Sequence, residues 1–147
     1  MSALLGGWHV DFPHHDPEQM FALAVDIESY PRFIPWCQKA RIRQRREHIL
    51  DVDNVFGTGP LQARFQSTAE LDPPHGLTIT SADGPFRRFR LQWHFSPLGE
   101  GGCRVEAEYE MVLRSPLMHS LASMTLPPME HKVVHNFKER VRQVYGR

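Results

Sequence analysis

Hydrophobic and polar residues alternate with a period of two along three long segments of the chain. Residues 61–71, 89–95 and 103–113 place apolar side chains at nearly every second position, with polar or charged side chains between them. This pattern is typical of a β-strand with one buried and one wet face. Weaker segments of the same kind, at 6–12, 39–46, 48–56 and 76–82, bring the predicted number of strands to about seven.

Two other segments have the period of a helix. Asp16, Pro17 and Gln19 are the residue types of an N-cap, a first helical position and a capping-box partner. An apolar face follows at spacings of three and four: Met20, Leu23, Ala24 and Ile27. A second apolar stripe lies near the end of the chain: Met129, Val133, Phe137, Val141 and Val144. It predicts a helix of about five turns from near Pro128 to Gly146.

Prolines interrupt both helical patterns. The stretch YPRFIPWC, residues 30–37, follows the first helix, and its two prolines should allow at most one further turn. Phe33 and Trp36 would then lie on a corner, as a plug of the core or as the rim of an entrance. Pro127 and Pro128 should separate a short helix that starts after Ser115 from the long terminal helix, with a kink between them.

This order of elements predicts an α+β fold, in which a curved antiparallel sheet of about seven strands surrounds a long C-terminal helix. A helix is only ~10–12 Å across, so it cannot cover such a sheet alone. Unless side chains fill the remaining space, an apolar cavity results. The chain has 147 residues, a length suited to a single domain over 1–147.

Charge gives little support for a nucleic-acid partner. Seventeen Lys and Arg balance seventeen Asp and Glu, and we predict no DNA binding. One stretch is basic, with Lys39, Arg41, Arg43 and Arg45 on one face of a strand and Arg46 after them. We favour an edge strand protected from mispairing; the alternative is contact with anionic lipid headgroups or ribosomal RNA.

The sequence shows neither a signal peptide nor a segment of ~20 apolar residues that could span a membrane. We therefore expect a cytoplasmic protein, with peripheral contact at the inner face of a respiratory membrane as a further hypothesis. Cys37 and Cys103 are expected to be reduced, partly buried thiols.

Catalytic and metal chemistry have few candidates. His131 and His135 are spaced like metal ligands, but they lie on the wet face of the last helix without the intervening glutamate of a zinc-protease motif. Glu130 is at the edge of the apolar stripe, and three amide or hydroxyl residues point inward by parity: Gln44, Asn54 and Ser67. This set is thin for acid–base catalysis, so we predict a binding protein without a metal rather than an enzyme.

Four blocks of the chain resemble the coenzyme-Q-binding START-like proteins of the polyketide cyclase/dehydrase, helix-grip superfamily. They are MFALAVDIESYPRFIPWC (20–37), DGPFRRFRLQWHF (83–95), GCRVEAEYEM (102–111) and FKERVRQVYG (137–146). The resemblance implies a helix-grip fold around a lipophilic tunnel. It also implies binding of ubiquinone or another isoprenoid quinone by a carrier that supports respiration, with no covalent cofactor.

Two alternatives stay open within this resemblance. Similar sequences are named ribosome-association toxins and are said to bind the large ribosomal subunit, and the superfamily also contains cyclases and dehydratases. The chain departs from the family pattern at Gly57, Gly59 and Pro60 and again at Pro127 and Pro128. Both departures fall near where an entrance to the cavity is expected.

The expected ligand contacts are apolar side chains on the inner face of the sheet, on the 30–37 corner and on the last helix. They are Phe33, Trp36, Phe65, Phe86, Phe89, Leu91, Trp93, Tyr109, Met111, Met129, Val133 and Phe137.

Overall fold

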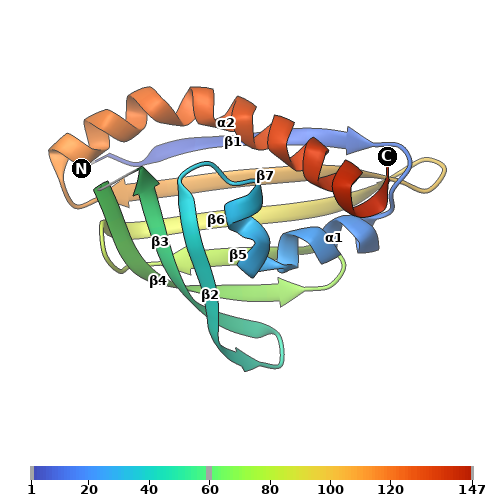
Figure 1. The fold of residues 1–147 in the computed structure, drawn as a ribbon, viewed down its shortest axis with the longest axis horizontal. Helices are drawn as coiled ribbons and strands as arrows, with labels where there is room; N and C mark the ends of the chain where they lie inside the picture. Colours follow the sequence, from blue (N-terminus) through green and yellow to red (C-terminus); the bar gives the residue numbers. More distant parts are fainter. Residues whose placement is uncertain (1, 59–60, 147) are drawn as a thin grey trace.

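The computed structural model describes residues 2–58 and 61–146. Figure 1 shows one curved sheet with a long helix lying along it. The elements, in chain order, are β1 (Leu4–Phe12), α1 (Pro17–Val25), the 3-10 helix η1 (Ile27–Arg32), β2 (Cys37–Arg46), β3 (Ile49–Thr58), β4 (Leu61–Asp72), β5 (Gly76–Ser81), β6 (Phe86–Leu98), β7 (Gly102–Leu113) and α2 (Pro116–Tyr145).

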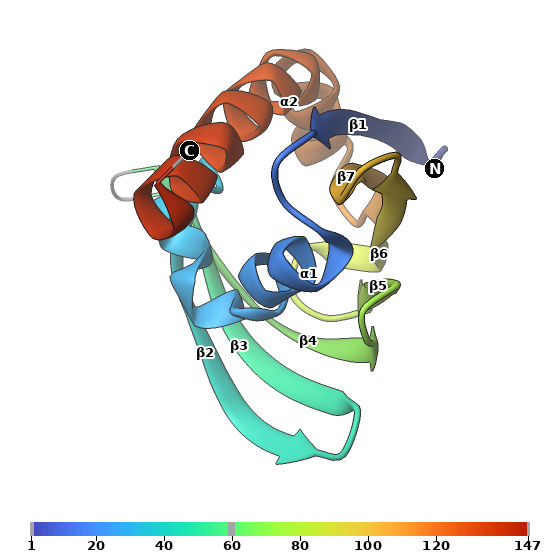
Figure 2. The ribbon, with the colours of Figure 1, turned by 90° about the vertical axis from the view of Figure 1, so that its right-hand side faces the viewer.

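The sheet confirms the predicted α+β, helix-grip architecture. Its seven strands follow the order β1-β7-β6-β5-β4-β3-β2, and every neighbouring pair is antiparallel. Seen end-on, the sheet curls around an interior with α2 across one side and α1 near the viewer (Figure 2). α1 therefore covers one end of the interior, which the N-terminal half of α2 does not reach.

The start of α1 has the predicted capping box. The Gln19 amide N–H donates to the Asp16 carboxylate at 2.9 Å, and the Asp16 N–H donates to the Gln19 side chain at 3.0 Å. These bonds satisfy backbone donors that a helix start leaves open. α1 ends at Val25, before the last position of the predicted apolar face, Ile27. The six residues of η1 follow as a 3-10 helix that contains Pro31.

α2 corrects the prediction of a helix that begins near Pro128 after a kink. It is one α-helix that starts at Pro116 and contains both Pro127 and Pro128. The N–H groups that these prolines lack would have bonded the carbonyls of Ser123 and Met124. Both of those residues are exposed, so water can replace the missing donors and the helix continues.

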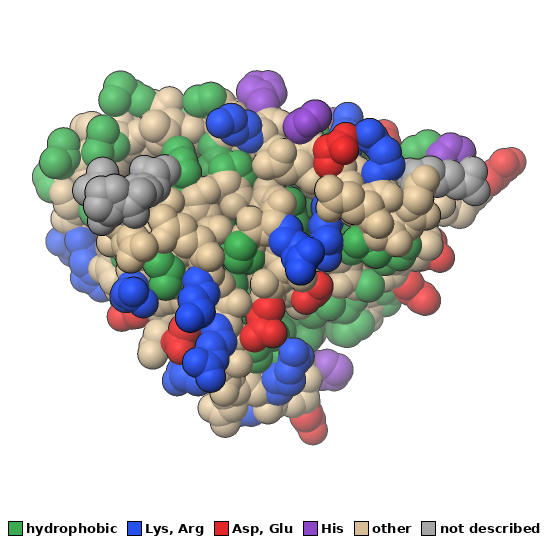
Figure 3. Space-filling view, viewed as in Figure 1, with side chains coloured by type: hydrophobic (Ala, Val, Ile, Leu, Met, Phe, Trp, Pro, Cys, Tyr) green, Lys and Arg blue, Asp and Glu red, His purple; other side chains and the backbone are tan. Residues whose placement is uncertain are grey.

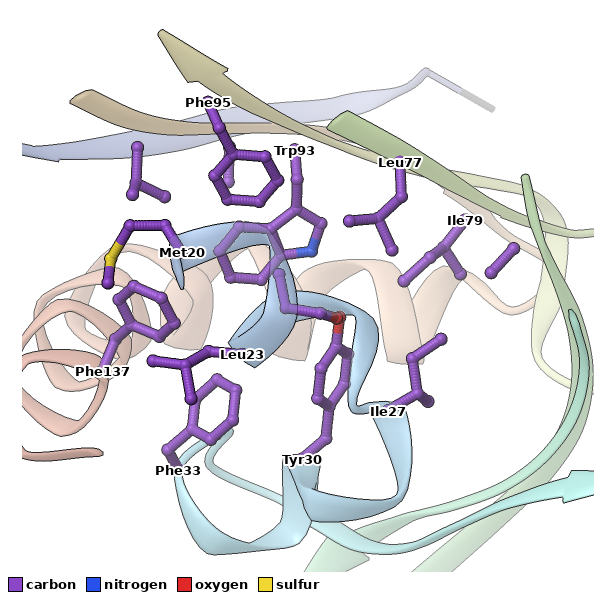
Figure 4. Close-up of a cluster of buried hydrophobic side chains, with 14 of the residues drawn as sticks. Met20, Leu23, Ile27, Tyr30, Phe33, Leu77, Ile79, Trp93, Phe95 and Phe137 are labelled. Atoms are coloured by element: carbon purple, nitrogen blue, oxygen red, sulfur yellow. The ribbon is translucent and has the colours of Figure 1, made fainter. Parts of the chain in front are cut away.

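The interior divides into two clusters of side chains. The larger, which we call the α1-end core, joins α1, η1 and the C-terminal half of α2 to the sheet. Trp93 and Phe137 are fully buried there with ring centroids 5.6 Å apart, and the Phe33 ring lies 5.5 Å from Phe137. Figure 4 shows the side chains of this core pointing toward one another. The α1-end core is therefore densely packed.

Candidate functional site

The second cluster, which we call the α2-start cluster, lies under the N-terminal half of α2. Its buried members are Phe65, Phe86, Tyr109, Met111, Leu113 and Leu126. Its half-buried members are Leu4, Trp8, Phe56, Phe89, Leu91, Ala122 and Met129. Half-buried members outnumber buried ones, the reverse of the α1-end core, although Trp8, Phe56, Phe89 and Leu91 pack against both clusters. This is the part of the interior where apolar surface is least covered.

Aromatic rings follow one another along the sheet side of this cluster. The Phe65 ring lies 5.4 Å from Phe56 and 5.0 Å from Phe86, which in turn lies 5.0 Å from Phe89. These separations are those of attractive ring pairs. The row presents aromatic surface on which a planar apolar molecule could pack.

One hydrogen-bonded pair lies inside this apolar region. The Tyr109 hydroxyl donates to the Glu130 carboxylate at 2.5 Å, and the Gly7 N–H donates to the same oxygen at 3.3 Å. A Cβ atom at Gly6 would overlap both the Tyr109 hydroxyl and the Glu130 carboxylate. Glycine at this position of β1 is what allows strand, tyrosine and carboxylate to approach so closely.

Burial and the Glu130 hydrogen bond both raise the pKa of Tyr109, with burial the larger cause. The phenol therefore stays protonated at neutral pH and remains a donor. Glu130 brings a carboxylate to a site that is otherwise apolar.

Three further polar side chains face the interior: Trp8, Asn54 and Ser67. The Trp8 indole N–H is buried and has no hydrogen-bond partner within 2–58 and 61–146, although its ring lies 6.4 Å from Tyr109. Asn54 and Ser67 are buried as predicted and share a hydrogen bond of 2.9 Å. Gln44, also predicted to point inward, is exposed because an irregularity between Ile42 and Gln44 shifts the register of β2.

The structure separates the twelve predicted ligand contacts into groups. Seven belong to the α2-start cluster: Phe65, Phe86, Phe89, Leu91, Tyr109, Met111 and Met129. Phe33, Trp93 and Phe137 are instead buried in the α1-end core, and Val133 is buried on α2. Ligand contact by any of the twelve stays a prediction.

The two predicted residues of the 30–37 corner differ in burial, and an entrance beside Trp36 stays a prediction. Phe33 is a plug, buried against Tyr30 and Phe137. Trp36 is 37% exposed and has a positive φ of 69°, a strained value for a bulky residue. The Trp36 carbonyl accepts the Gly57 N–H at 2.8 Å, which ties the corner to β3. The other predicted features of that turn, Gly59 and Pro60, lie outside the described residues.

Two hollows of the described residues are lined mainly by polar side chains of the sheet, unlike the expected apolar cavity, which stays a prediction. One, of about 540 Å³, is lined by Arg43, Thr68, Thr80 and Arg90 among others. The other, of about 410 Å³, is lined by residues that include Lys39 and Arg64. These side chains alternate with the buried positions of their strands, so both hollows lie on the outer face of the sheet. The α1-end core is filled because α1 and η1 supply side chains that α2 alone could not.

The basic stretch lies on β2, which is an edge strand as predicted. Arg43 is 3.5 Å from Asp53, and Arg46 is 2.9 Å from Asp51. The register shifts in β2 interrupt the alternation that placed all these residues on one face. Three of its cations have no ion pair among the described residues: Lys39, Arg41 and Arg45.

The two histidines and two cysteines considered in the sequence analysis lie at the positions expected for them. His131 and His135 are exposed on α2, and no group of metal-ligating side chains occurs within the described part of the chain. Cys37 and Cys103 are free, buried thiols. Burial raises the pKa of Cys37 to about 12 and that of Cys103 to about 11.

Several members of the site were absent from the sequence prediction. Trp8 and Phe56 lie at inward positions of their strands, and their parity could have identified them. Ala122 and Leu126 were missed because the terminal helix was expected to begin near Pro128. The hydrogen bond between Gly7 and Glu130 joins residues 123 positions apart, which no local pattern indicates.

Comparison with known proteins identifies a matching family and relatives that carry different names. Residues 13–138 match the family described as polyketide cyclase/dehydrase and lipid transport. The ribosome association toxin RatA of Vibrio cholerae is 31% identical over 130 residues, which cover 88% of this chain and 90% of the toxin. The mitochondrial coenzyme Q-binding protein COQ10 homolog B of Xenopus laevis is 25% identical, over 88% of this chain and 55% of that protein.

A solved START superfamily protein from Mycobacterium smegmatis has the same fold. It superposes with a TM-score of 0.76 over 95% of this chain and 98% of its own, at 15% identity.

Proposed function

Because the chain belongs to the polyketide cyclase/dehydrase and lipid transport family, we propose that it binds an isoprenoid quinone, and ubiquinone in particular. It would act as a carrier that supports respiratory electron transport. The observation that carries the proposal is the α2-start cluster, in which half-buried aromatic rings surround a few polar groups. Sites for small lipophilic molecules have this composition. The name of the Xenopus relative supports the choice of a quinone.

The polar groups of the site suit both redox forms of a quinone. An oxidised quinone carries carbonyl acceptors, and the Trp8 N–H is a buried donor that has no partner in the described structure. A reduced quinone carries hydroxyl donors, and the Glu130 carboxylate can accept them. Pairing the Trp8 N–H would remove the free-energy cost of an unsatisfied buried donor.

The apolar members can make room for the ring and the isoprenoid tail. Met111 and Met129 have flexible thioether side chains that fill irregular spaces and re-pack easily. The rings of Phe65, Phe86 and Phe89 offer stacking surfaces. Entry of a ligand at this end does not require the α1-end core to open.

Solvent extraction of the purified protein followed by mass spectrometry tests the proposal. We expect an isoprenoid quinone in the extract, and a rise in melting temperature when a short-tail ubiquinone is added to emptied protein. An extract without quinone, together with an unchanged melting temperature, would refute the proposal.

Ribosome association is the second candidate, supported by the similarity to RatA over most of both chains. If it is correct, the cations of β2 without an ion pair should contact ribosomal RNA, and binding should weaken with salt. We expect co-sedimentation with large ribosomal subunits to fall for Arg41→Glu with Arg45→Glu, but not for the control Arg142→Glu on α2. Absence of co-sedimentation at low salt would remove this candidate.

Catalysis ranks below binding. Glu130 and Tyr109 are the acid–base pair in the site, and the Glu130 carboxylate already accepts two hydrogen bonds. A cyclase or dehydratase built on this pair should lose turnover of a polyketide-like substrate in Glu130→Gln. Unchanged turnover would exclude that role for Glu130.

A further inference from the structure

The N-terminal half of α2 exposes an unusual amount of apolar surface. Four of the seven exposed large hydrophobic side chains of the described residues lie on its first three turns. They are Leu117 (69% exposed), Met118 (37%), Leu121 (50%) and Met124 (67%). Figure 3 shows hydrophobic side chains gathered over this part of α2, whereas charged and histidine side chains mark its other half. We call these four residues the α2 face.

The same half-helix is apolar on its opposite side as well. Ala122, Leu126 and Met129 face the α2-start cluster, while Leu117, Leu121 and Met124 repeat at spacings of four and three on the exposed side. The exposed side also carries Ser120 and Ser123, but large apolar side chains predominate on both sides, and such a helix surface is normally covered. Here the sheet covers only one side.

The charge and hydrogen bonding of this half-helix indicate which medium covers its exposed side. Between Pro116 and Met129 the sequence contains no Asp, Glu, Lys or Arg. The Ser123 hydroxyl donates to the Ser120 carbonyl and the Thr125 hydroxyl donates to the Leu121 carbonyl, both at 2.8 Å. These hydroxyls are bonded within the helix. The Ser123 and Met124 carbonyls, which Pro127 and Pro128 leave without a donor, still need water, so this surface suits the hydrated boundary between headgroups and acyl chains.

The surroundings of the α2 face complement anionic headgroups. Arg114 precedes the helix, and its guanidinium donates to the Gly84 and Ala82 carbonyls at 3.1 and 3.0 Å. Exposed Arg87 is the second residue of the neighbouring strand β6, which pairs with the end of β7. Of the nearby acids, Glu110 is paired with Arg88 at 2.8 Å and Asp83 accepts the Gln66 N–H at 2.7 Å. Basic side chains at the border of an apolar helix face are typical of helices that lie on anionic membranes.

We infer that the α2 face docks on the surface of an anionic phospholipid bilayer, with the side chains of Leu117, Leu121 and Met124 inserted at the boundary between headgroups and acyl chains. No helix of the described residues is long and apolar enough to cross a bilayer, so the contact is interfacial. The inference deepens the proposed function and rests on it, because the buried side of the same half-helix covers the proposed quinone site. Docking would bring that site to the membrane that dissolves the quinone.

Vesicle flotation tests the inference with the full chain. Vesicles of phosphatidylethanolamine and phosphatidylglycerol should bind the wild-type protein, and Leu117→Glu with Leu121→Glu should weaken binding roughly tenfold or more. The matched control, Gln143→Glu with Val144→Glu, adds the same charge to the exposed C-terminal part of α2 and should bind as wild type. The neutral pair Leu117→Gln with Leu121→Gln should also lose binding, which separates insertion from charge repulsion.

The outcomes distinguish the inference from the function on which it rests. Quinone binding measured in solution with a short-tail ubiquinone should be unchanged in the face variants, and circular dichroism should show that they remain folded. Wild-type protein that binds quinone but no vesicles would overturn the docking inference alone. Vesicle binding without quinone binding would refute the proposed function and leave the docking.

Two other occupants of the α2 face would also overturn the inference. A dimer seen by sedimentation velocity and lost in the Leu117 and Leu121 variants would make the face a contact between two copies. Ribosome co-sedimentation lost in the same variants would make it a ribosomal contact.

Discussion

At the α1 end of the interior, α1, η1 and the C-terminal half of α2 all pack on the sheet, whereas the N-terminal half of α2 covers the other end alone. Both ends are rich in aromatic rings. The first nevertheless buries Trp93 and Phe137 completely, while the second leaves Phe89 and Met129 half-buried and places a carboxylate among them. The two ends therefore differ less in residue composition than in the number of elements that pack over them. The end covered by α2 alone is the candidate ligand site.

The strongest way to break the α1-end core is to remove its central ring. Phe137→Ala deletes a fully buried side chain that contacts Phe12, Phe33 and Trp93. We expect the free energy of unfolding to fall by ~3–5 kcal/mol, because the variant loses both burial and packing around a cavity. Urea unfolding measures this loss. A loss below ~1 kcal/mol would mean that this end is not densely packed.

Alkaline pH should also act on the α1-end core. Burial raises the pKa of Cys37 to about 12 and that of Cys103 to about 11, from 9.0 in an exposed thiol. Above pH 9 the unfolded chain loses these protons before the folded chain does, so the free energy of unfolding should fall as pH rises toward 11. Urea unfolding at a series of pH values measures the slope. The double variant Cys37→Ala with Cys103→Ala should have a smaller slope of the free energy of unfolding against pH. An unchanged slope would mean that other titrating groups cause it.

At the α2 start, a comparable deletion should cost less stability. Phe89→Ala removes a half-buried ring, and we expect the free energy of unfolding to fall by ~1–2 kcal/mol, since water already reaches part of the site. The same variant should weaken the binding of a short-tail ubiquinone, measured by fluorescence titration. A stability loss as large as that of Phe137→Ala, with unchanged quinone affinity, would erase the difference between the two ends.

The smallest expected effect comes from single hydroxyl groups. Tyr109→Phe removes the hydrogen bond to Glu130, and Tyr30→Phe removes one to the Ala24 carbonyl at 2.6 Å in the α1-end core. Each should lower the free energy of unfolding by ~1 kcal/mol. Only Tyr109→Phe should also change the affinity for quinone. Equal affinities in the two variants would argue against a ligand role for the Tyr109–Glu130 pair.

Local patterns in the sequence predicted most of the fold. Alternation identified the strands because each has one buried face, and the Asp16 capping box marked the start of α1. The interrupted pattern at Pro127 and Pro128 led to a wrong start for α2, because local chemistry does not reveal that solvent-exposed carbonyls tolerate the prolines. The irregularity in β2 likewise moved Gln44 out of the interior, since one extra residue reverses the parity of a strand.

The candidate site was predicted only in part because its boundaries depend on which helix packs over each part of the sheet. Alternation along the strands placed Phe65, Tyr109 and Met111 on the inner face of the sheet, as observed, but it placed Trp93 there as well. Only the position of α1 decides which of these residues lie in a closed core. The contact between Gly7 and Glu130 depends on how α2 crosses β1, which no pattern along the chain determines.

The central claim is that a quinone binds in the α2-start cluster and not in the α1-end core. Photolysis with a photoreactive short-tail ubiquinone, followed by peptide mass spectrometry, tests it most directly. The account predicts labels on residues of the α2-start cluster, such as Met111 and Met129, that unlabelled ubiquinone prevents. Labels confined to the α1-end core, or none that unlabelled ubiquinone prevents, would contradict it.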